Sequence, residues 1–230
     1  MKKIAVVLIL ICASMQANAQ LFTKEKIRNR ENVDKKRWSW GYYLGFNNYG
    51  FKIDYIDQNE IDVTRNIGFN VGLVGNLRVN DYIDIRLEPG VVFANRNLEF
   101  PNLTETFERE REVKSSYVHI PLLIKFSSKR INNFKPFLVG GASVSHNLSS
   151  NENNPNDNSA GEFRMKTNVA NLEVGFGIDF YFEYFKFTPS IRGIFAITDE
   201  LVQDNDPNSP WTSEIDSMKS RGLFINFTFQ

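Results

Sequence analysis

The segment Ile83-Asp84-Ile85-Arg86-Leu87-Glu88-Pro89-Gly90-Val91-Val92-Phe93-Ala94 decides the fold. Its large apolar side chains Ile83, Ile85 and Leu87 alternate with the charged residues Asp84, Arg86 and Glu88. A strand places successive side chains on opposite faces, whereas a helix would mix these two sets on every face. The segment therefore predicts a β-strand with one apolar face and one polar face.

The same alternation recurs along the chain from Trp38 onward, and it predicts about eight strands. The other stretches are residues 38–47, 67–78, 117–126, 134–146, 171–180, 185–195 and 222–229. Within 134–146 both alternating sets are apolar or small, so the register of this fifth stretch stays open. The stretches have roughly 10 residues each, the length that a tilted strand needs to cross a bilayer.

The connections between these stretches alternate between short and long. Short ones fall at 79–81, 127–133 and 183–184, and long polar ones at 48–66, 97–114, 147–167 and 198–220. Outer-membrane barrels have short periplasmic turns and long external loops. The sequence thus predicts an all-β fold, an eight-stranded antiparallel transmembrane β-barrel of the OmpX/OmpA type. An even strand number places both chain ends in the periplasm.

The polar parity of the predicted strands carries charges of both signs at strand centres. These residues are Asp84, Arg86, Glu88, Lys125, Glu173, Asp179, Lys186 and Arg192. A secreted soluble barrel or sandwich would point its apolar set inward instead. Aromatic residues cluster at the strand ends, as they do at a membrane interface, and glycines gather on the polar side. We therefore expect the charges to pair inside a narrow lumen, as structural groups, while the apolar set faces lipid.

The first residues have the pattern of an export signal. Lys2 and Lys3 precede the apolar run 4–12, and Ala17-Asn18-Ala19 has the small-x-small form of a cleavage site. We expect a signal peptide at 1–19, a charged periplasmic extension at 20–37, mobile or weakly helical, and an outer-membrane barrel at 38–230. Cleavage would remove Cys12, the only cysteine, so we expect no disulfide and no Cys-ligated metal.

No residue set in the sequence predicts an active site, a metal site or a cofactor. A barrel hydrolase would need a histidine in register with a serine and a carboxylate. His119, His146, Ser115, Ser116 and Glu173 are present, but the sequence gives no reason to place them together. We expect His119 to be a hydrogen-bonded lumen residue. The formal net charge of zero argues against nucleic acid as a partner, and no small-molecule substrate is evident.

Three segments resemble the PorT family of Bacteroidota outer-membrane proteins. They are 37–47 with 51–53, 120–130 with Asn132, Asn133 and Pro136, and 180–182 with 184–187 and Pro189. The resemblance implies a non-enzymatic component of the type IX secretion system, which exports proteins across the outer membrane and supports gliding motility in some species. It implies outer-membrane lipid and other secretion-system envelope proteins as partners, and no catalytic residues. The residues leave two alternatives open: a generic structural or adhesive OmpX-like barrel, and a lipid-modifying barrel enzyme.

Overall fold

The computed structural model describes residues 28–56 and 61–230. The predicted signal peptide, 1–19, and the first part of the predicted extension lie outside the described residues. In chain order the elements are η2 (Val33–Lys35), β1 (Trp38–Tyr55), β2 (Asp62–Arg65), β3 (Ile67–Arg78), β4 (Ile83–Leu87), β5 (Gly90–Glu99), α2 (Thr106–Arg109), β6 (Glu110–Ser127), β7 (Phe134–Asn147), η3 (Asn158–Ala160), β8 (Asn168–Tyr181), β9 (Lys186–Ala196) and β10 (Ile215–Phe229). Within the described ranges, no helix is long and apolar enough to cross a membrane.

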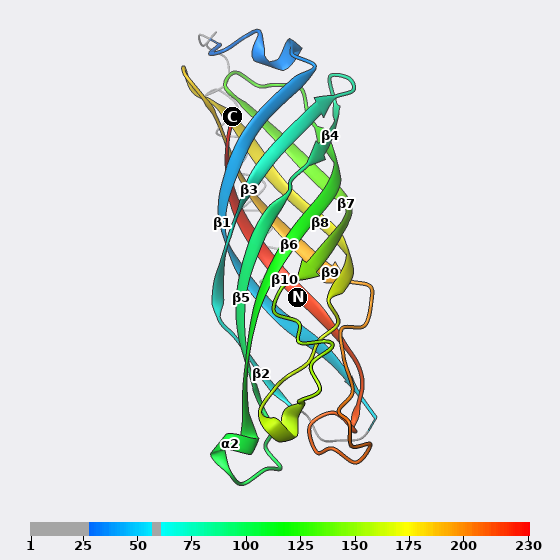
Figure 1. Cartoon of the computed structure of the whole chain (residues 1–230). Coiled ribbons are helices and arrows are strands. Elements are labelled where there is room, and N and C mark those ends of the chain that lie inside the picture. Colours follow the sequence, from blue (N-terminus) through cyan, green and yellow to red (C-terminus); the bar gives the residue numbers. More distant parts are fainter. Residues whose placement is uncertain (1–27, 57–60) are drawn as a thin grey trace, which may run out of the picture.

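The strands form one antiparallel sheet that closes into a tilted barrel (Figure 1). Closure comes from β1, which pairs with β10 on one side and with β3 on the other. Nine of the ten strands correspond to the eight predicted ones, because the predicted stretch 83–94 is divided into β4 and β5. The tenth, β2, is a short additional strand within the predicted loop 48–66. Asn66 alone separates β2 from β3, and Glu88 with Pro89 separates β4 from β5. Proline has no N–H to donate to the ladder, which explains the interruption between β4 and β5. The predicted antiparallel barrel is confirmed.

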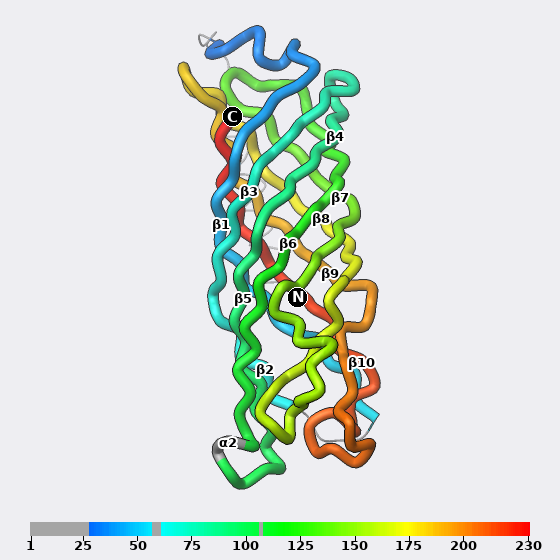
Figure 2. Tube along the Cα trace, in the orientation of Figure 1, coloured from blue at the N-terminus to red at the C-terminus, as the bar shows by residue number. Residues whose placement is uncertain are grey.

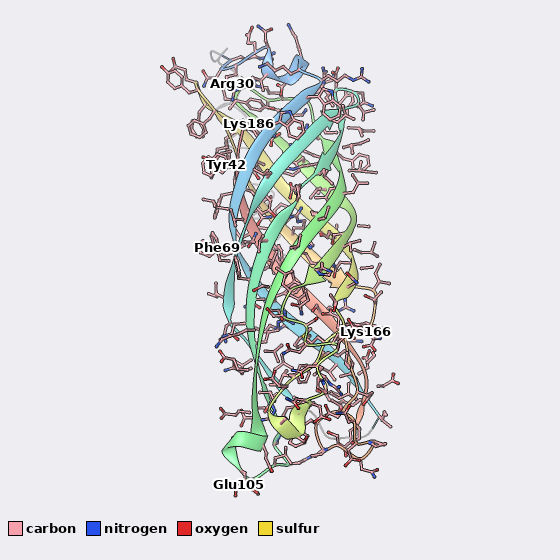
Figure 3. All side chains as sticks on the ribbon, viewed as in Figure 1. Arg30, Tyr42, Phe69, Glu105, Lys166 and Lys186 are labelled. Atoms are coloured by element: carbon pink, nitrogen blue, oxygen red, sulfur yellow. The ribbon has the colours of Figure 1, made fainter. Side chains whose placement is uncertain are left out.

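The large apolar side chains of the strands point outward and form what we call the apolar belt. Figure 3 shows this orientation for Tyr42 and Phe69. The outward set includes Trp40, Tyr42, Leu44, Phe46, Phe69, Leu73, Ile85, Leu122, Ile124, Leu138, Val144, Val174, Phe176, Ile191, Phe195, Leu223 and Ile225. Trp40 is 70% exposed and Leu122 is 57% exposed. An exposed apolar surface of this extent is unfavourable in water and indicates an apolar surrounding such as lipid. The expectation of a lipid-facing apolar set is confirmed.

Strand β7, whose register the sequence left open, has a definite orientation. Leu138 and Val144 point outward, while Phe137, Val139 and Ser145 point into the lumen. The lumen side here is partly apolar, and for this reason alternation alone could not distinguish the two faces. A Cβ at Gly141 would lie 2.2 Å from the Leu122 carbonyl oxygen, so glycine allows β6 and β7 to approach closely.

The strands extend further at the loop end than the sequence predicted. β1 continues to Tyr55 and pairs with β10 from Ile215 onward, and β5 continues to Glu99 and pairs with β6 from Glu110. The prediction of long loops over 48–66, 97–114 and 198–220 is therefore wrong for these strand residues. We call this part the external head: residues 49–55, 62–65, 95–114, 148–167 and 197–221. It forms the loop-rich lower part of the molecule in Figure 1, where α2 lies.

The external head has an apolar core of its own inside the barrel. This core consists of Phe51, Leu98, Phe100, Val113, Phe163, Met165, Leu201, Ile215 and Met218. Phe163, Met165 and Leu201 come from the loops, which therefore fold over the barrel mouth and close it. Outward positions in the head are polar, as at Lys52 and Glu112. In the head the outward residues are polar, and the inward set mixes apolar residues with the buried Arg96 and Arg111. Such a stretch lacks a clear apolar alternation and looks like loop in the sequence, which explains the error.

Residues 28–37, which we call the N-terminal segment, cross the opposite, turn end of the barrel (Figure 2). They contain one 3-10 turn, η2, and are bonded to the barrel. Asp34 accepts a hydrogen bond from Tyr181 Oη at 2.7 Å and pairs with Arg130 Nη1 at 3.3 Å. Asn29 and Arg30 donate to the carbonyl oxygens of Tyr181 and Gln230. The described part of the predicted extension is thus fixed at the turn end.

Candidate functional site

The centre of the lumen holds a network of four charged side chains from three strand regions. Arg192 on β9 donates from Nη1 to Glu88 Oε2 at 2.9 Å, and its Nε lies 3.0 Å from Glu173 Oε2 on β8. Arg86 on β4 also contacts Glu88. All four side chains are at most 5% exposed. An unpaired buried charge costs several kcal/mol, so the alternating acids and bases stabilise one another.

A second charge cluster lies nearer the turn end. Lys125 Nζ donates to Asp179 Oδ2 at 2.6 Å, and Thr188 Oγ1 donates to Asp179 Oδ1 at 2.7 Å. The Lys125 ammonium also lies 4.0 Å from the centre of the Phe137 ring. The cluster fixes β6, β8 and β9 relative to one another across the lumen.

The remaining two predicted charges lie at the turn-end mouth of the barrel. Lys186 is buried and Asp84 is half-buried, and both line a small polar cavity under the N-terminal segment. Neither forms an ion pair within the described part of the chain. Seven of the eight predicted charges are therefore buried, Lys186 among them, and Asp84 is the one that is only half-buried.

The structure brings together a serine, a histidine and a carboxylate that the sequence did not connect. His119 Nδ1 lies 2.8 Å from Ser145 Oγ, and His119 Nε2 lies 2.8 Å from Glu173 Oε1. A carboxylate, an imidazole and a hydroxyl in this order are the parts of a serine hydrolase relay. The serine is Ser145 of β7, and not Ser115 or Ser116.

The surroundings of this relay bury it inside the lumen. Ser145 also accepts a hydrogen bond from Asn171 Nδ2 at 3.0 Å, and the Phe224 ring lies 6.0 Å from the His119 ring. Ser145 and His119 are each 2% exposed. A substrate carbonyl could reach Ser145 only if the barrel opened. His146, the other histidine, faces outward and contacts Asn168 Oδ1 at 2.8 Å.

An arginine marks the boundary between the charged lumen and the apolar core of the external head. Arg96 is fully buried, with its guanidinium 4.2 Å from the Phe51 ring centre and 5.1 Å from that of Tyr49. Its Nη2 donates to Tyr117 Oη at 2.9 Å. Aromatic faces attract a cation and replace part of its lost hydration. The Arg96 guanidinium and the aromatic rings packed around it thus fill the lumen at this level.

Glu200, in the connection between β9 and β10, is the one fully buried carboxylate near Arg96 in the described head. It accepts hydrogen bonds from Ser220 N at 2.7 Å and Ser220 Oγ at 3.0 Å. Burial raises the pKa of the Glu200 carboxyl, against the opposing effect of the Arg96 guanidinium. The carboxyl attaches the loop to β10 from inside the head.

The residues that sequence reasoning missed are Ser145, Arg96 and Glu200. Ser145 lies in the stretch with the open register, and fixing that register would have placed it opposite His119. Arg96 and Glu200 lie at or beyond the ends of the predicted strands. No cluster of three or more His, Cys, Asp or Glu side chains in residues 28–56 and 61–230 could hold a metal ion.

A closed antiparallel sheet with an apolar outer belt and a filled polar lumen defines a transmembrane β-barrel. The model of the outer membrane protein beta-barrel domain family matches residues 18–202, so the chain belongs to this family and is an outer-membrane protein. No curated protein matches the chain.

Several solved outer-membrane proteins are similar in structure. OprG from Pseudomonas aeruginosa is 14% identical, with 82% of this chain and 94% of OprG covered and a TM-score of 0.46. Neisserial surface protein A is 11% identical, with coverages of 84% and 98% and a TM-score of 0.47. Ail of Yersinia pestis, in complex with a heparin analogue, is 13% identical, with coverages of 84% and 99% and a TM-score of 0.39. Likenesses this distant carry no inference about function.

Proposed function

We propose that this chain is a structural and adhesive outer-membrane barrel that holds a folded external head at the cell surface. The observation that supports the proposal best is the apolar core of the head, in which loop residues such as Phe163 and Leu201 pack against strand residues such as Leu98. Loops that pack on a core present a defined outer surface rather than a flexible one. Such a surface suits contact with other molecules outside the cell.

The filled lumen argues against a function as a pore. Charged side chains occupy its centre. On the side toward the head, the Tyr49 ring makes edge contacts with the rings of Tyr117 and Phe224, with ring centres 5.7 and 5.6 Å apart. Narrow eight-stranded barrels are usually filled by side chains in this way. We expect no stepwise ion conductance when the purified protein is inserted into planar bilayers.

Cell attachment tests the adhesive function. Residues 149–161 would be replaced by a Gly/Ser linker of equal length, which removes the hydrogen bond from Asn205 N to Asp157 Oδ2 that joins two loops. We expect attachment of cells to protein-coated surfaces to fall, while the band that shifts on boiling in SDS gels is kept. Glu183→Gln, in a short turn at the other end, is the matched control. Unchanged attachment after the loop replacement would contradict the proposal.

A second candidate is a PorT-like accessory of type IX secretion, which would act through periplasmic protein partners. The resemblance of residues 37–47 and 120–130 to that family favours it, together with the exposed cations Lys35, Lys36 and Arg37 at the turn end. Deleting the gene and measuring release of type IX cargo tests it, and normal secretion would refute it. Restoring secretion with the variant that lacks loop 149–161 would separate this role from adhesion.

Export by a cleaved signal peptide is part of both proposals. The pattern Ala17-Asn18-Ala19 places the cleavage after residue 19. Intact-mass measurement of the protein from outer membranes should give a chain that begins at Gln20. A mass that includes residues 1–19 would show an uncleaved anchor instead.

A further inference from the structure

A cationic groove lies at the turn end, where the N-terminal segment meets the start of β1 and the end of β3. Lys35, Arg37, Leu77, Arg78, Val79 and Asn80 line it. Three of the six lining residues are cations, and two are apolar. With a volume of about 450 Å³, the groove is large enough for a phosphate-bearing headgroup.

Bonds on both sides hold the groove in shape. The Arg78 N–H donates to the Arg37 carbonyl at 2.8 Å, which attaches the N-terminal segment to the end of β3. Asp34, which precedes Lys35 in sequence, bonds instead to Tyr181 and Arg130 of the barrel. Asp34 is therefore not an ion-pair partner of Lys35 or Arg37, which line the groove together with Arg78.

The charges of the groove are only partly balanced. Arg78 contacts Asp81, and Lys35 Nζ donates to the neutral Asn32 Oδ1 at 3.2 Å. In the described ranges, neither Lys35 nor Arg37 forms an ion pair with a carboxylate. Two exposed cations thus remain for an anion from outside the chain.

The position of the groove indicates the source of that anion. Trp38 follows Arg37 directly, is 55% exposed and stacks on Trp40 with ring centres 6.3 Å apart. Trp38 also pairs in register with Leu77, a lining residue of the groove. Tryptophans of this kind lie at the headgroup level of a bilayer. The short turns of outer-membrane barrels lie on the periplasmic side, which places the groove at the headgroups of the inner leaflet.

We propose that this groove binds the phosphate of an anionic phospholipid in the inner leaflet of the outer membrane. The phosphate lies between Lys35, Arg37 and Arg78, and the acyl chains continue along Trp38 and Leu77 onto the apolar belt. Basic pockets beside membrane-spanning elements bind anionic headgroups in this manner. A lipid fits better than an acidic protein because the groove is continuous with the surface that already contacts lipid.

Native mass spectrometry of the purified full chain tests this assignment. The probes are phosphatidylglycerol, which is anionic, and phosphatidylcholine, which carries a phosphate but no net charge. We expect the wild type to retain phosphatidylglycerol in preference to phosphatidylcholine. The double variant Lys35→Gln/Arg37→Gln should lose roughly tenfold or more of that preference, because each basic residue near an anionic headgroup contributes to binding.

The double variant Lys52→Gln/Lys219→Gln is the matched control. Lys52 on β1 pairs in register with Lys219 on β10 in the external head, at the opposite end of β1 from the groove. The control should keep the full preference, and both variants should keep the band that shifts on boiling. Equal losses in the two variants, or an unchanged preference in the groove variant, would overturn the assignment. Unchanged lipid binding together with loss of a co-purifying acidic envelope protein would assign the groove to a protein and overturn it as well.

Discussion

The apolar belt and the external head are built from the same strands with opposite patterns. Along β1, Leu44 in the belt faces outward beside the inward Tyr43, whereas in the head Lys52 faces outward beside the inward Phe51. The strand keeps its alternation of two throughout, and only the chemistry of each face changes. In lipid the outer face must be apolar, and polar groups must pair inside. In water the apolar groups are buried instead.

The contrast between the two regions shows that the medium outside the barrel determines which side chains fill its interior. The belt has a lumen of paired charges, such as Arg192 with Glu88 and Glu173. The head has a lumen of apolar side chains, and Arg96 with its aromatic neighbours lies between the two regions. Each region should therefore respond to a different kind of substitution.

The largest effect is expected from removing the central lumen cation. Arg192→Gln leaves Glu88 and Glu173 buried without their shared guanidinium, which should cost about 3–5 kcal/mol of folding free energy. Urea unfolding of the protein in detergent, followed by the band shift on boiling, measures it. Lys52→Gln removes an exposed ion pair with Asp54 and should change nothing measurable. A barrel as stable as the wild type after Arg192→Gln would show that the pairs contribute little.

A cavity in the apolar core of the head should lower the local stability of the head and leave that of the belt unchanged. Leu98→Ala removes a side chain that is 1% exposed in the apolar core, at a cost of roughly 2–5 kcal/mol. Amide hydrogen exchange should rise in residues 95–114 and 215–221, while the belt strands keep their protection. Leu44→Ala, at a lipid-facing position, is the control and should leave exchange in the head unchanged. A uniform rise over the whole barrel would mean that the two regions unfold as one unit.

The outer faces can be compared on a single strand, β6. Leu122→Lys places a charge on the lipid face of the belt, which should cost about 2–4 kcal/mol if the position lies near the midplane. Glu112→Lys, on the same parity of the same strand but in the head, should refold and shift on boiling like the wild type. Refolding yield into lipid vesicles measures both. Equal tolerance of the two lysines would place the membrane boundary elsewhere on β6.

The smallest effect concerns the pH dependence of the head. The pKa of Glu200 is raised by burial, so the folded head favours its protonated form. Its contribution to stability is present below the ordinary carboxyl pKa and is lost as the pH rises through the raised value. Glu200→Gln should remove this dependence. Amide exchange rates at Ser220 between pH 4 and 7, corrected for intrinsic exchange, would measure this pH-dependent stability. Glu112→Gln, at an exposed position, is the control. Identical pH profiles in wild type and Glu200→Gln would contradict the expectation.

Local alternation was enough to predict most of the barrel, because a strand's period of two acts residue by residue. Ile85 and Leu87 outward, with Arg86 and Glu88 inward, follow directly from neighbouring positions. The contact between Ser145 and His119 could not be predicted in this way. It depends on the pairing of β6 with β7, a register that joins residues 26 positions apart.

Residue patterns were enough to predict the membrane-spanning strands, their antiparallel succession and the apolar outer face of the belt. These features depend on side chains a few residues apart and on the length needed to cross a bilayer. The end of the belt, the register of β7 and the position of the N-terminal segment became clear only from the folded chain. Each of these three features depends on contacts between residues far apart in the sequence, and alternation along one strand contains no information about such contacts.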